Sequence, residues 1–233
     1  MSEPLSYRVD REVAVITMDD GKANALGPSM LRALDEALGR AEQEGRAVVL
    51  AGRAGKFCAG FDLKVMMSAP TAARDLVLDG AKLFLRLFEH PRPVVIACTG
   101  HAVAGGALLV LCGDLRVGTE GPFMIGLNEV AIGLTLPRFA VELARERLSP
   151  RAMGAATVLA TMYAPNDAAN AGYLDEVVEA DAVLERAISE AQRLGALPAA
   201  AFAGTKQRVR ETAISRRREA VKRDAADMDA SLS

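Results

Sequence analysis

The sequence predicts an α/β fold, because apolar runs typical of buried strands alternate with segments that have helical periodicity. Residues 47–52 and 94–98 are continuous apolar runs, as in strands that are buried on both faces of a parallel sheet. Residues 28–44 and 71–88 instead repeat apolar side chains every three or four positions, the period of an amphipathic helix. This alternation favours parallel strands joined by helical crossovers.

Local signals delimit the other elements of the first two thirds of the chain. Residues 5–18 hold two β-prone runs and predict a hairpin or a meander. Gly45 follows the first helical pattern at a position typical of a helix C-cap, and Pro91 ends the second pattern. Residues 105–113 predict a short buried helix, and a further strand is expected to begin at Leu115.

The last third of the chain is mainly helical in pattern. Ser149–Pro150 suits the N-cap and first position of a helix that we expect to run through Leu159. Another helix is expected over residues 181–197, and the Ala-, Arg- and Glu-rich chain that follows shows no strand pattern. We therefore predict an α/β core over residues 1–185 and a C-terminal helical region over residues 186–233.

Composition narrows the function classes. The 233 residues are 51% hydrophobic and 25% charged, as in an ordinary globular protein, so we exclude a disordered chain and a fibre. The net charge of −2 predicts no basic surface for nucleic acid. The sequence shows neither a secretory leader nor a run of about 18 apolar residues, so we expect no membrane partner and a cytoplasmic location.

Motifs for metals and nucleotide cofactors are missing from the sequence. The three cysteines and two histidines are not spaced as in a zinc site or a disulfide framework. Residues 52–57 depart from the phosphate-loop pattern, and residues 100–106 lack the spacing of a dinucleotide-binding loop. We therefore expect neither a metal nor a separate cofactor.

Two glycine-bearing turns and one isolated carboxylate remain as candidates for chemistry. Residues 57–63 and 100–106 each follow a predicted buried strand, and their small residues let a ligand approach the backbone. Two backbone N–H groups that converge from such turns form an oxyanion hole. Glu129 is the only charged residue between Phe123 and Leu136. Because apolar surroundings raise the proton affinity of a carboxylate, Glu129 suits a role in proton transfer.

Four sequence blocks resemble the successive signatures of the crotonase, or enoyl-CoA hydratase/isomerase, superfamily. They occupy residues 21–30, 55–63, 100–117 and 125–134, and the similarity extends over residues 5–180. The resemblance implies a crotonase-like spiral of ββα turns with a C-terminal helical trimerisation region, assembled as a homotrimer or a dimer of trimers. It also implies acyl-CoA thioester substrates from fatty acid metabolism, with coenzyme A as part of the substrate.

The resemblance also implies roles for particular residues. The oxyanion hole would consist of the backbone N–H groups of Phe61 and Gly105. Because only the backbone of Phe61 would act, we expect its side chain to matter little. The resemblance places the CoA moiety beside Ala59, Phe61, Asp62 and Leu63, with Lys206 reaching a CoA phosphate.

One departure from the family pattern indicates the reaction. Hydratases of this family hold a water molecule with two glutamates, and the corresponding positions here are Leu108 and Glu129. Leucine neither positions nor deprotonates water. Glu129 alone suits a Δ3,Δ2-enoyl-CoA isomerase, in which it would move a proton from C2 to C4 through a dienolate held by the oxyanion hole. Residues 126–148 also resemble such isomerases.

Other functions stay open at the level of the sequence. A hydratase could use a second carboxylate elsewhere, with Glu120, Asp114 and Glu142 as candidates. The same oxyanion hole would also serve an acyl-CoA hydrolase or decarboxylase. A non-catalytic member would bind CoA or act as a scaffold, although the paired glycine turns and Glu129 argue against that role.

Overall fold

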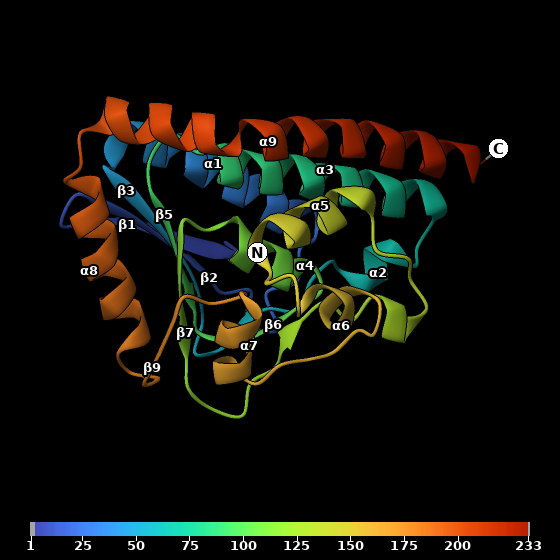
Figure 1. The fold of residues 1–233 in the computed structure, drawn as a ribbon, viewed down its shortest axis with the longest axis horizontal. Coiled ribbons are helices and arrows are strands. Elements are labelled where there is room, and N and C mark those ends of the chain that lie inside the picture. Colours follow the sequence, from blue (N-terminus) through green and yellow to red (C-terminus); the bar gives the residue numbers. More distant parts are fainter. Residues whose placement is uncertain (1–2, 233) are drawn as a thin grey trace.

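The computed structural model describes residues 3–232 and consists of two β-sheets surrounded by helices (Figure 1). The larger sheet has the strand order β1-β2-β3-β5-β7-β9, and the smaller sheet has the order β4-β6-β8. The strands are β1 (Leu5–Asp10), β2 (Val13–Met18), β3 (Ala47–Gly52), β4 (Gly55–Cys58), β5 (Val94–Cys98), β6 (Gly100–Val103), β7 (Leu115–Thr119), β8 (Ile125–Gly126) and β9 (Glu176–Val178).

The helices include the predicted segments at almost the expected bounds. They are α1 (Pro28–Glu44), α2 (Leu63–Met66), α3 (Pro70–Glu89), α4 (Gly105–Cys112), α5 (Arg138–Arg147), α6 (Met153–Thr157), α7 (Pro165–Ala171), α8 (Val183–Gly195) and α9 (Ala199–Ala230), with the 3-10 helix η1 (Val130–Ile132). Within residues 3–232, no helix is both long and apolar enough to cross a membrane.

Strands of the two sheets alternate along the chain, which confirms the predicted spiral of ββα turns. Strand β3 of the larger sheet is followed by β4 of the smaller sheet and then by α2 and α3. The same order recurs in β5, β6 and α4, and again in β7, β8 and α5. The hairpin β1–β2 is antiparallel, as expected, and the other strand pairs of the two sheets are parallel.

The two faces of the larger sheet bury separate cores. Val15 and Val49 face α8, where they pack with Ile188. The next residues along the same strands, Ile16 and Leu50, belong to the main core on the opposite face, because successive side chains of a strand alternate between faces. Helices α1, α3 and α4 contribute to this main core.

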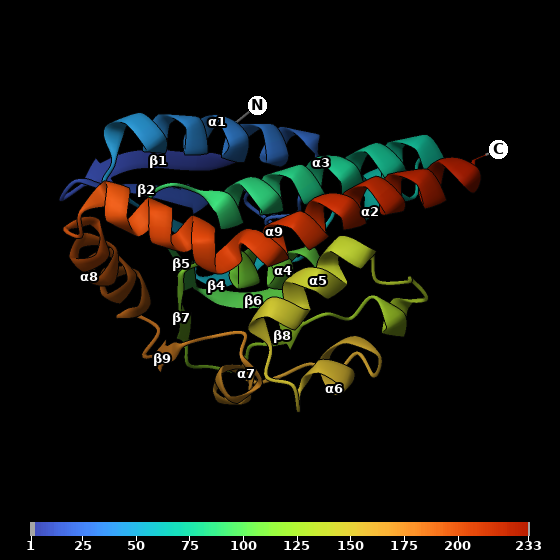
Figure 2. The same cartoon turned by 45° about the horizontal axis from the view of Figure 1, so that its top comes forward.

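The position of α8 corrects the expected domain boundary. A boundary between residues 185 and 186 would cut α8, which contacts β2, β3, β5 and β7 and covers one face of the sheet. The helical region that lies outside the sheet begins instead with α9. Figures 1 and 2 show α9 crossing the molecule beside α3 and α5, both of which it contacts.

The helix expected from Ser149–Pro150 to Leu159 is shorter than predicted. A turn precedes α6, because the carbonyl oxygen of Ser149 accepts the N–H groups of both Ala152 (3.0 Å) and Met153 (3.1 Å). The regular helix covers only Met153–Thr157.

Glycines allow the smaller sheet to pack directly against neighbouring backbone. A Cβ on Gly100 would lie 2.1 Å from the carbonyl carbon of Gly55, and one on Gly52 would lie 2.4 Å from the oxygen of Lys56. Since both neighbours are backbone atoms, no flexible side chain can move aside to relieve the contact.

Gly100→Ala should lower the free energy of unfolding by at least about 2 kcal/mol, because the added methyl group overpacks against β4. Urea denaturation measures this change. Gly154→Ala is the matched control, since a Cβ there meets nothing within 4 Å, and it should keep or slightly raise stability. Equal stability of Gly100→Ala and wild type would show that this contact does not constrain the fold.

Candidate active site

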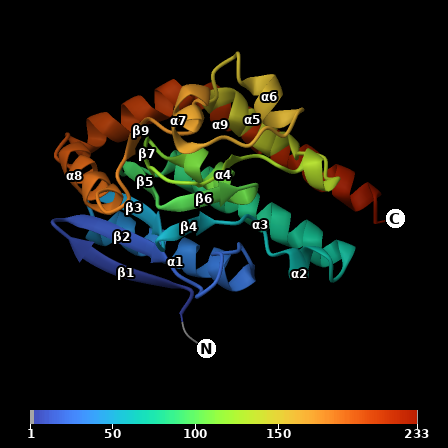
Figure 3. The ribbon, with the colours of Figure 1, turned by 90° about the horizontal axis from the view of Figure 1, so that it is seen from below.

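The three strands of the smaller sheet end next to the three residues that the sequence singles out for catalysis. Strand β4 leads to Phe61, β6 leads to Gly105 and β8 leads to Glu129. Because these strands are parallel neighbours, their carboxyl ends lie at one edge of the sheet. Figure 3 shows β4 and β6 side by side. This edge is the position where ligands bind in many parallel sheets.

The backbone of Phe61 is held by the neighbouring segment at Leu26. Leu26 donates its N–H to the oxygen of Gly60 at 2.8 Å and accepts the N–H of Asp62 at 3.2 Å. Backbone groups of an extended segment alternate in direction, so the N–H of Phe61 points away from Leu26. It lies close to α4, because a Cβ built on Gly105 would be 3.5 Å from the Phe61 nitrogen.

Gly105 is the first residue of α4, and its N–H has no acceptor within the helix. The preceding residue, Ala104, adopts a left-handed φ of +52°, which directs the chain sharply from β6 into the helix. Within residues 3–232, no hydrogen-bond acceptor pairs with the N–H of Phe61 or Gly105. Two free donors beside each other at a helix N-terminus suit the stabilisation of a negative oxygen.

Glu129 lies in a tight turn just after β8. Its carbonyl oxygen accepts the N–H groups of Ile132 (3.1 Å) and Leu134 (2.9 Å), and Gly133 completes the turn with a left-handed φ of +79°. The residue is only 9% exposed, and its Oε2 atom has no hydrogen-bond partner among the described residues. Burial raises the pKa of the Glu129 carboxyl above its ordinary value. A base of this kind binds a proton more readily than a solvated glutamate does.

Two further polar residues adjoin Glu129, and sequence reasoning missed both. Asn128 has a buried Oδ1 atom that lacks a hydrogen-bond partner among residues 3–232. Tyr173 is fully buried, and its ring packs on that of Tyr163 with centroids 5.8 Å apart. Burial raises the pKa of Tyr173, and the charge of Glu129 raises it further. Tyr173 lies after α7, far from Glu129 along the chain, so no local sequence signal connects the two.

Sequence reasoning also missed Asn24, which connects the larger sheet to β4. Its Nδ2 donates to the backbone oxygens of Met18 (3.0 Å), Lys56 (3.0 Å) and Phe57 (3.2 Å). Its left-handed φ of +53° is a conformation that asparagine tolerates better than most residues. Its place in the first of the four family-like blocks was the available signal.

Leu108 stands where hydratases of this family are expected to carry a glutamate, and it is buried among apolar side chains. Leu108 lies in α4, is 2% exposed and belongs to the main core. Of the alternative carboxylates, Asp114 follows the opposite end of α4 and is paired with Lys206 and Arg210. Glu120 is exposed beyond the end of β7. Leu108 therefore supplies no carboxylate to the first turn of α4, and Asp114 lies beyond the other end of that helix.

Lys206 projects into the protein rather than toward solvent. Its Nζ donates to Oδ2 of Asp114 at 2.7 Å, and both side chains are largely buried. Burial is the main reason why the pKa of Lys206 falls to about 8. The Lys206 ammonium thus forms an ion pair with Asp114, which the sequence did not predict. The contact of Lys206 with a CoA phosphate stays a prediction.

In the loop predicted to contact CoA, some residues are exposed and others make contacts within the protein. Ala59 is exposed, and Leu63, at the start of α2, is 60% exposed. The Asp62 carboxylate caps α2 by accepting the N–H of Lys64 at 2.9 Å. The half-buried ring of Phe61 packs against α3, with its centroid 6.0 Å from that of Phe84. The ring therefore has a packing contact, and the expectation that the side chain at position 61 matters little for the chemistry stays a prediction.

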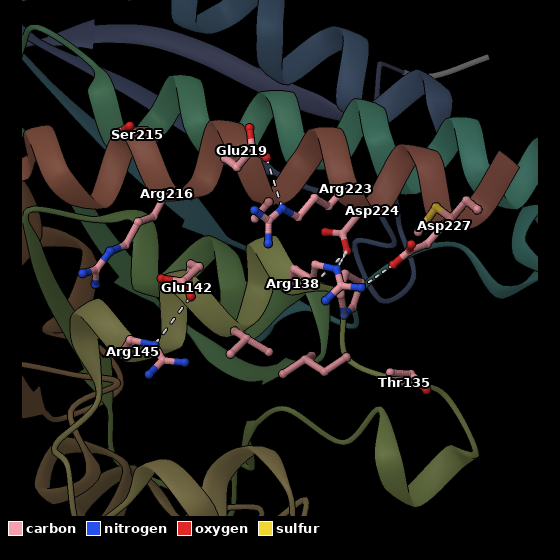
Figure 4. A pocket seen from close by; sticks show the side chains of 15 residues that line it. Thr135, Arg138, Glu142, Arg145, Ser215, Arg216, Glu219, Arg223, Asp224 and Asp227 are labelled. Carbon is pink, nitrogen blue, oxygen red and sulfur yellow. Dashed lines mark hydrogen bonds and ion pairs between the residues drawn. The ribbon is translucent and has the colours of Figure 1, made fainter. Parts of the chain in front are cut away.

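A cavity of about 910 Å³ lies between α5 and α9 (Figure 4). Its charged side chains are mostly paired, as in Glu142 with Arg145 (3.6 Å) and Glu219 with Arg223 (3.1 Å). None of the three catalytic candidates lines it. Glu142, the third alternative carboxylate, therefore lines a cavity that contains none of these candidates.

No cluster of three or more potential metal ligands occurs among the residues that the structure describes. The three cysteines are buried and unpaired with one another, and burial raises the pKa of the Cys58 and Cys98 thiols to about 12. Thiols of this kind are poor nucleophiles and poor metal ligands.

Comparison with known proteins relates this geometry to a family. The enoyl-CoA hydratase/isomerase family profile matches residues 8–231. Mitochondrial enoyl-CoA delta isomerase 1 of Mus musculus is 32% identical over 191 residues, which are 80% of this chain and 66% of that protein. A probable enoyl-CoA hydratase of Bacillus subtilis is also 32% identical, over 66% of this chain and 59% of that protein.

Solved structures match over nearly their whole length. The apo structure of an enoyl-CoA isomerase from Mycobacterium tuberculosis has a TM-score of 0.93 and 42% identity, covering 97% of this chain and 99% of that one. The aligned part of the chain covers 66% and 59% of the two curated relatives, which is less than two thirds of each. The curated isomerase and the curated hydratase are equally similar to this chain, at 32% identity each.

Glu129→Gln should raise the free energy of unfolding at neutral pH by roughly 1 kcal/mol or more, because it removes a buried carboxylate charge that pairs with no cation among residues 3–232. The raised pKa means that ionisation of Glu129 costs stability. The advantage of the variant should therefore grow as pH rises from about 4.5, the ordinary value, through the raised pKa.

Thermal unfolding across this pH range measures the difference. Glu36→Gln is the control, because Glu36 is an exposed residue of α1 and loses little hydration on folding. A stability difference for Glu129→Gln that is independent of pH would contradict the raised pKa.

Proposed function

Because the chain belongs to the enoyl-CoA hydratase/isomerase family, we propose that it is a Δ3,Δ2-enoyl-CoA isomerase that acts on acyl-CoA thioesters. The observation that carries the proposal is the combination of one buried carboxylate, Glu129, with the apolar Leu108 at the other hydratase position. A double-bond shift needs one group that removes and returns a proton, whereas hydration needs a positioned water molecule.

The first step of the proposed reaction is proton removal from C2 of a 3-enoyl thioester. The Glu129 carboxylate takes the proton, and the C–H bond electrons form a C1–C2 double bond. Negative charge moves to the thioester oxygen, and the product is a dienolate. The N–H groups of Phe61 and Gly105 would donate to this oxygen, and each such donor stabilises a transition state by about 3 kcal/mol.

The second step returns the same proton to C4. The dienolate electrons reform the thioester carbonyl and place the double bond between C2 and C3, while Glu129 becomes a carboxylate again. Atoms and charge balance without water, a metal or a separate cofactor, since coenzyme A remains attached to the acyl group. The raised pKa of Glu129 supports this cycle, because the carboxyl must hold the proton between the two steps.

Hydration is the alternative with specific support, because relatives of similar identity are named hydratases. It would require a water molecule that Glu129 activates without a second carboxylate. We further propose that the chain assembles as a homotrimer or a dimer of trimers. Light scattering distinguishes these assemblies, and a 24.6 kDa monomer would contradict them.

The test is a parallel assay of the purified protein with a trans-3-enoyl-CoA and a trans-2-enoyl-CoA. We expect the first substrate to give the conjugated product and the second to show no hydration. Hydration at a comparable rate would favour the alternative. No turnover of either substrate would overturn both activities and leave another acyl-CoA reaction or a binding role.

Glu129→Gln should lower the isomerisation rate by at least about a hundredfold while acyl-CoA binding persists, because the amide cannot accept the proton. Glu142→Gln is the matched control, since Glu142 lies in the separate cavity and pairs with Arg145. It should keep near wild-type activity. Full activity of Glu129→Gln would remove this residue from the mechanism.

A further inference from the structure

The side chain of Phe61 occupies space that exists because residue 80 is glycine. A Cβ built on Gly80 would lie 2.3 Å from Cε1 and 2.5 Å from Cζ of the Phe61 ring. Atoms of real side chains do not approach so closely, so the ring fills the place of the missing methyl group. We call this space the Gly80 notch.

Gly80 has no conformational reason to be glycine. It lies in the middle of α3, without a positive φ, and a glycine in a helix interior is less favourable than alanine. The ring of Phe61 is the contact that accounts for it, since the two nearest atoms to a Cβ at this position belong to that ring.

The ring also contacts a second residue of the same helix. Phe84, one turn further along α3, is 1% exposed, and its ring lies 6.0 Å from that of Phe61 at an interplanar angle of 47°. Phe84 in turn packs on Phe139 of α5, with centroids 6.2 Å apart. The Phe61 ring therefore packs against α3 across Gly80 and Phe84, and Phe84 connects this contact to the core.

The backbone of Phe61 is held by a different segment, at Leu26. Leu26 holds the peptide groups on both sides of Phe61 through its own N–H and carbonyl, and Asp62 begins α2 as its N-cap. The ring and the backbone of Phe61 are thus held by two different elements. The Phe61 nitrogen lies beside the start of α4, 3.5 Å from a Cβ built on Gly105.

We infer that Gly80 and Phe84 are positioning residues, which orient the Phe61 N–H by holding its ring in the Gly80 notch. The inference deepens the proposed function and rests on it, because the oriented N–H is one donor of the proposed oxyanion hole. It predicts that filling the notch impairs stabilisation of the enolate rather than binding of the CoA moiety.

Gly80→Ala fills the notch and tests the inference. We expect kcat for isomerisation of a trans-3-enoyl-CoA to fall by at least about tenfold, since small displacements of catalytic groups have large effects on rate. KM should change by less than about threefold, because the CoA contacts are not altered. The double variant Phe61→Leu/Gly80→Ala, which removes the clashing ring atoms, should recover the activity of Phe61→Leu alone within about threefold.

A second readout does not depend on turnover. Acetoacetyl-CoA ionises to an enolate that absorbs in the ultraviolet, and its enolate form should bind to Gly80→Ala at least about tenfold more weakly than to wild type. Phe61→Ala leaves the notch empty and cannot clash, so it tests the same point if Gly80→Ala fails to fold. It should weaken enolate binding by a similar factor.

Gly204→Ala in α9 is the matched helical control, because a Cβ there meets nothing within 4 Å. It should keep wild-type kcat and enolate affinity. Normal kcat and enolate affinity in folded Gly80→Ala and in Phe61→Ala would overturn the inference, as would a double variant that stays as impaired as Gly80→Ala. A wild-type protein that binds the enolate but does not isomerise would refute the proposed function alone.

Discussion

Direct backbone packing at three glycines determines where the candidate catalytic groups lie. A Cβ would approach Lys56 O to 2.4 Å from Gly52, Gly55 C to 2.1 Å from Gly100, and Cys58 O to 2.1 Å from Gly106. These contacts bring the smaller sheet against the chain that leaves the larger sheet and bring α4 against β4. Both proposed oxyanion donors depend on this packing, because Phe61 follows β4 and Gly105 begins α4.

Helix α4 is held at both ends, and the two ends have opposite electrostatic character. Its N-terminus presents the free N–H of Gly105, where the helix dipole favours negative charge. At its C-terminal end, Arg147 donates to the oxygens of Leu111 (3.0 Å) and Gly113 (2.7 Å), and Asp114 accepts the N–H of Val94 at 2.8 Å. Lys206 therefore contributes to this C-terminal anchor through Asp114, which explains its burial.

The sequence was sufficient for elements whose signals are local, but not for contacts between distant segments. The periodicity of residues 28–44 and the glycine that follows them predicted α1 at its observed bounds. The turns at Phe61 and Gly105 could be identified from glycine patterns and family resemblance. The role of the Phe61 ring could not, because it depends on Gly80, which joins Phe61 only through the packing of α3. Tyr173 was missed for the same reason.

Isomerisation of a 3-enoyl-CoA with deuterium at both C2 positions tests the central claim most directly, namely that one buried carboxylate carries the proton. In ordinary water, we predict that deuterium removed from C2 is found at C4 of the 2-enoyl product, because Glu129 is shielded from solvent while it holds the label. Mass spectrometry and NMR locate the label. Solvent hydrogen alone at C4 would contradict transfer by Glu129 from one carbon to the other.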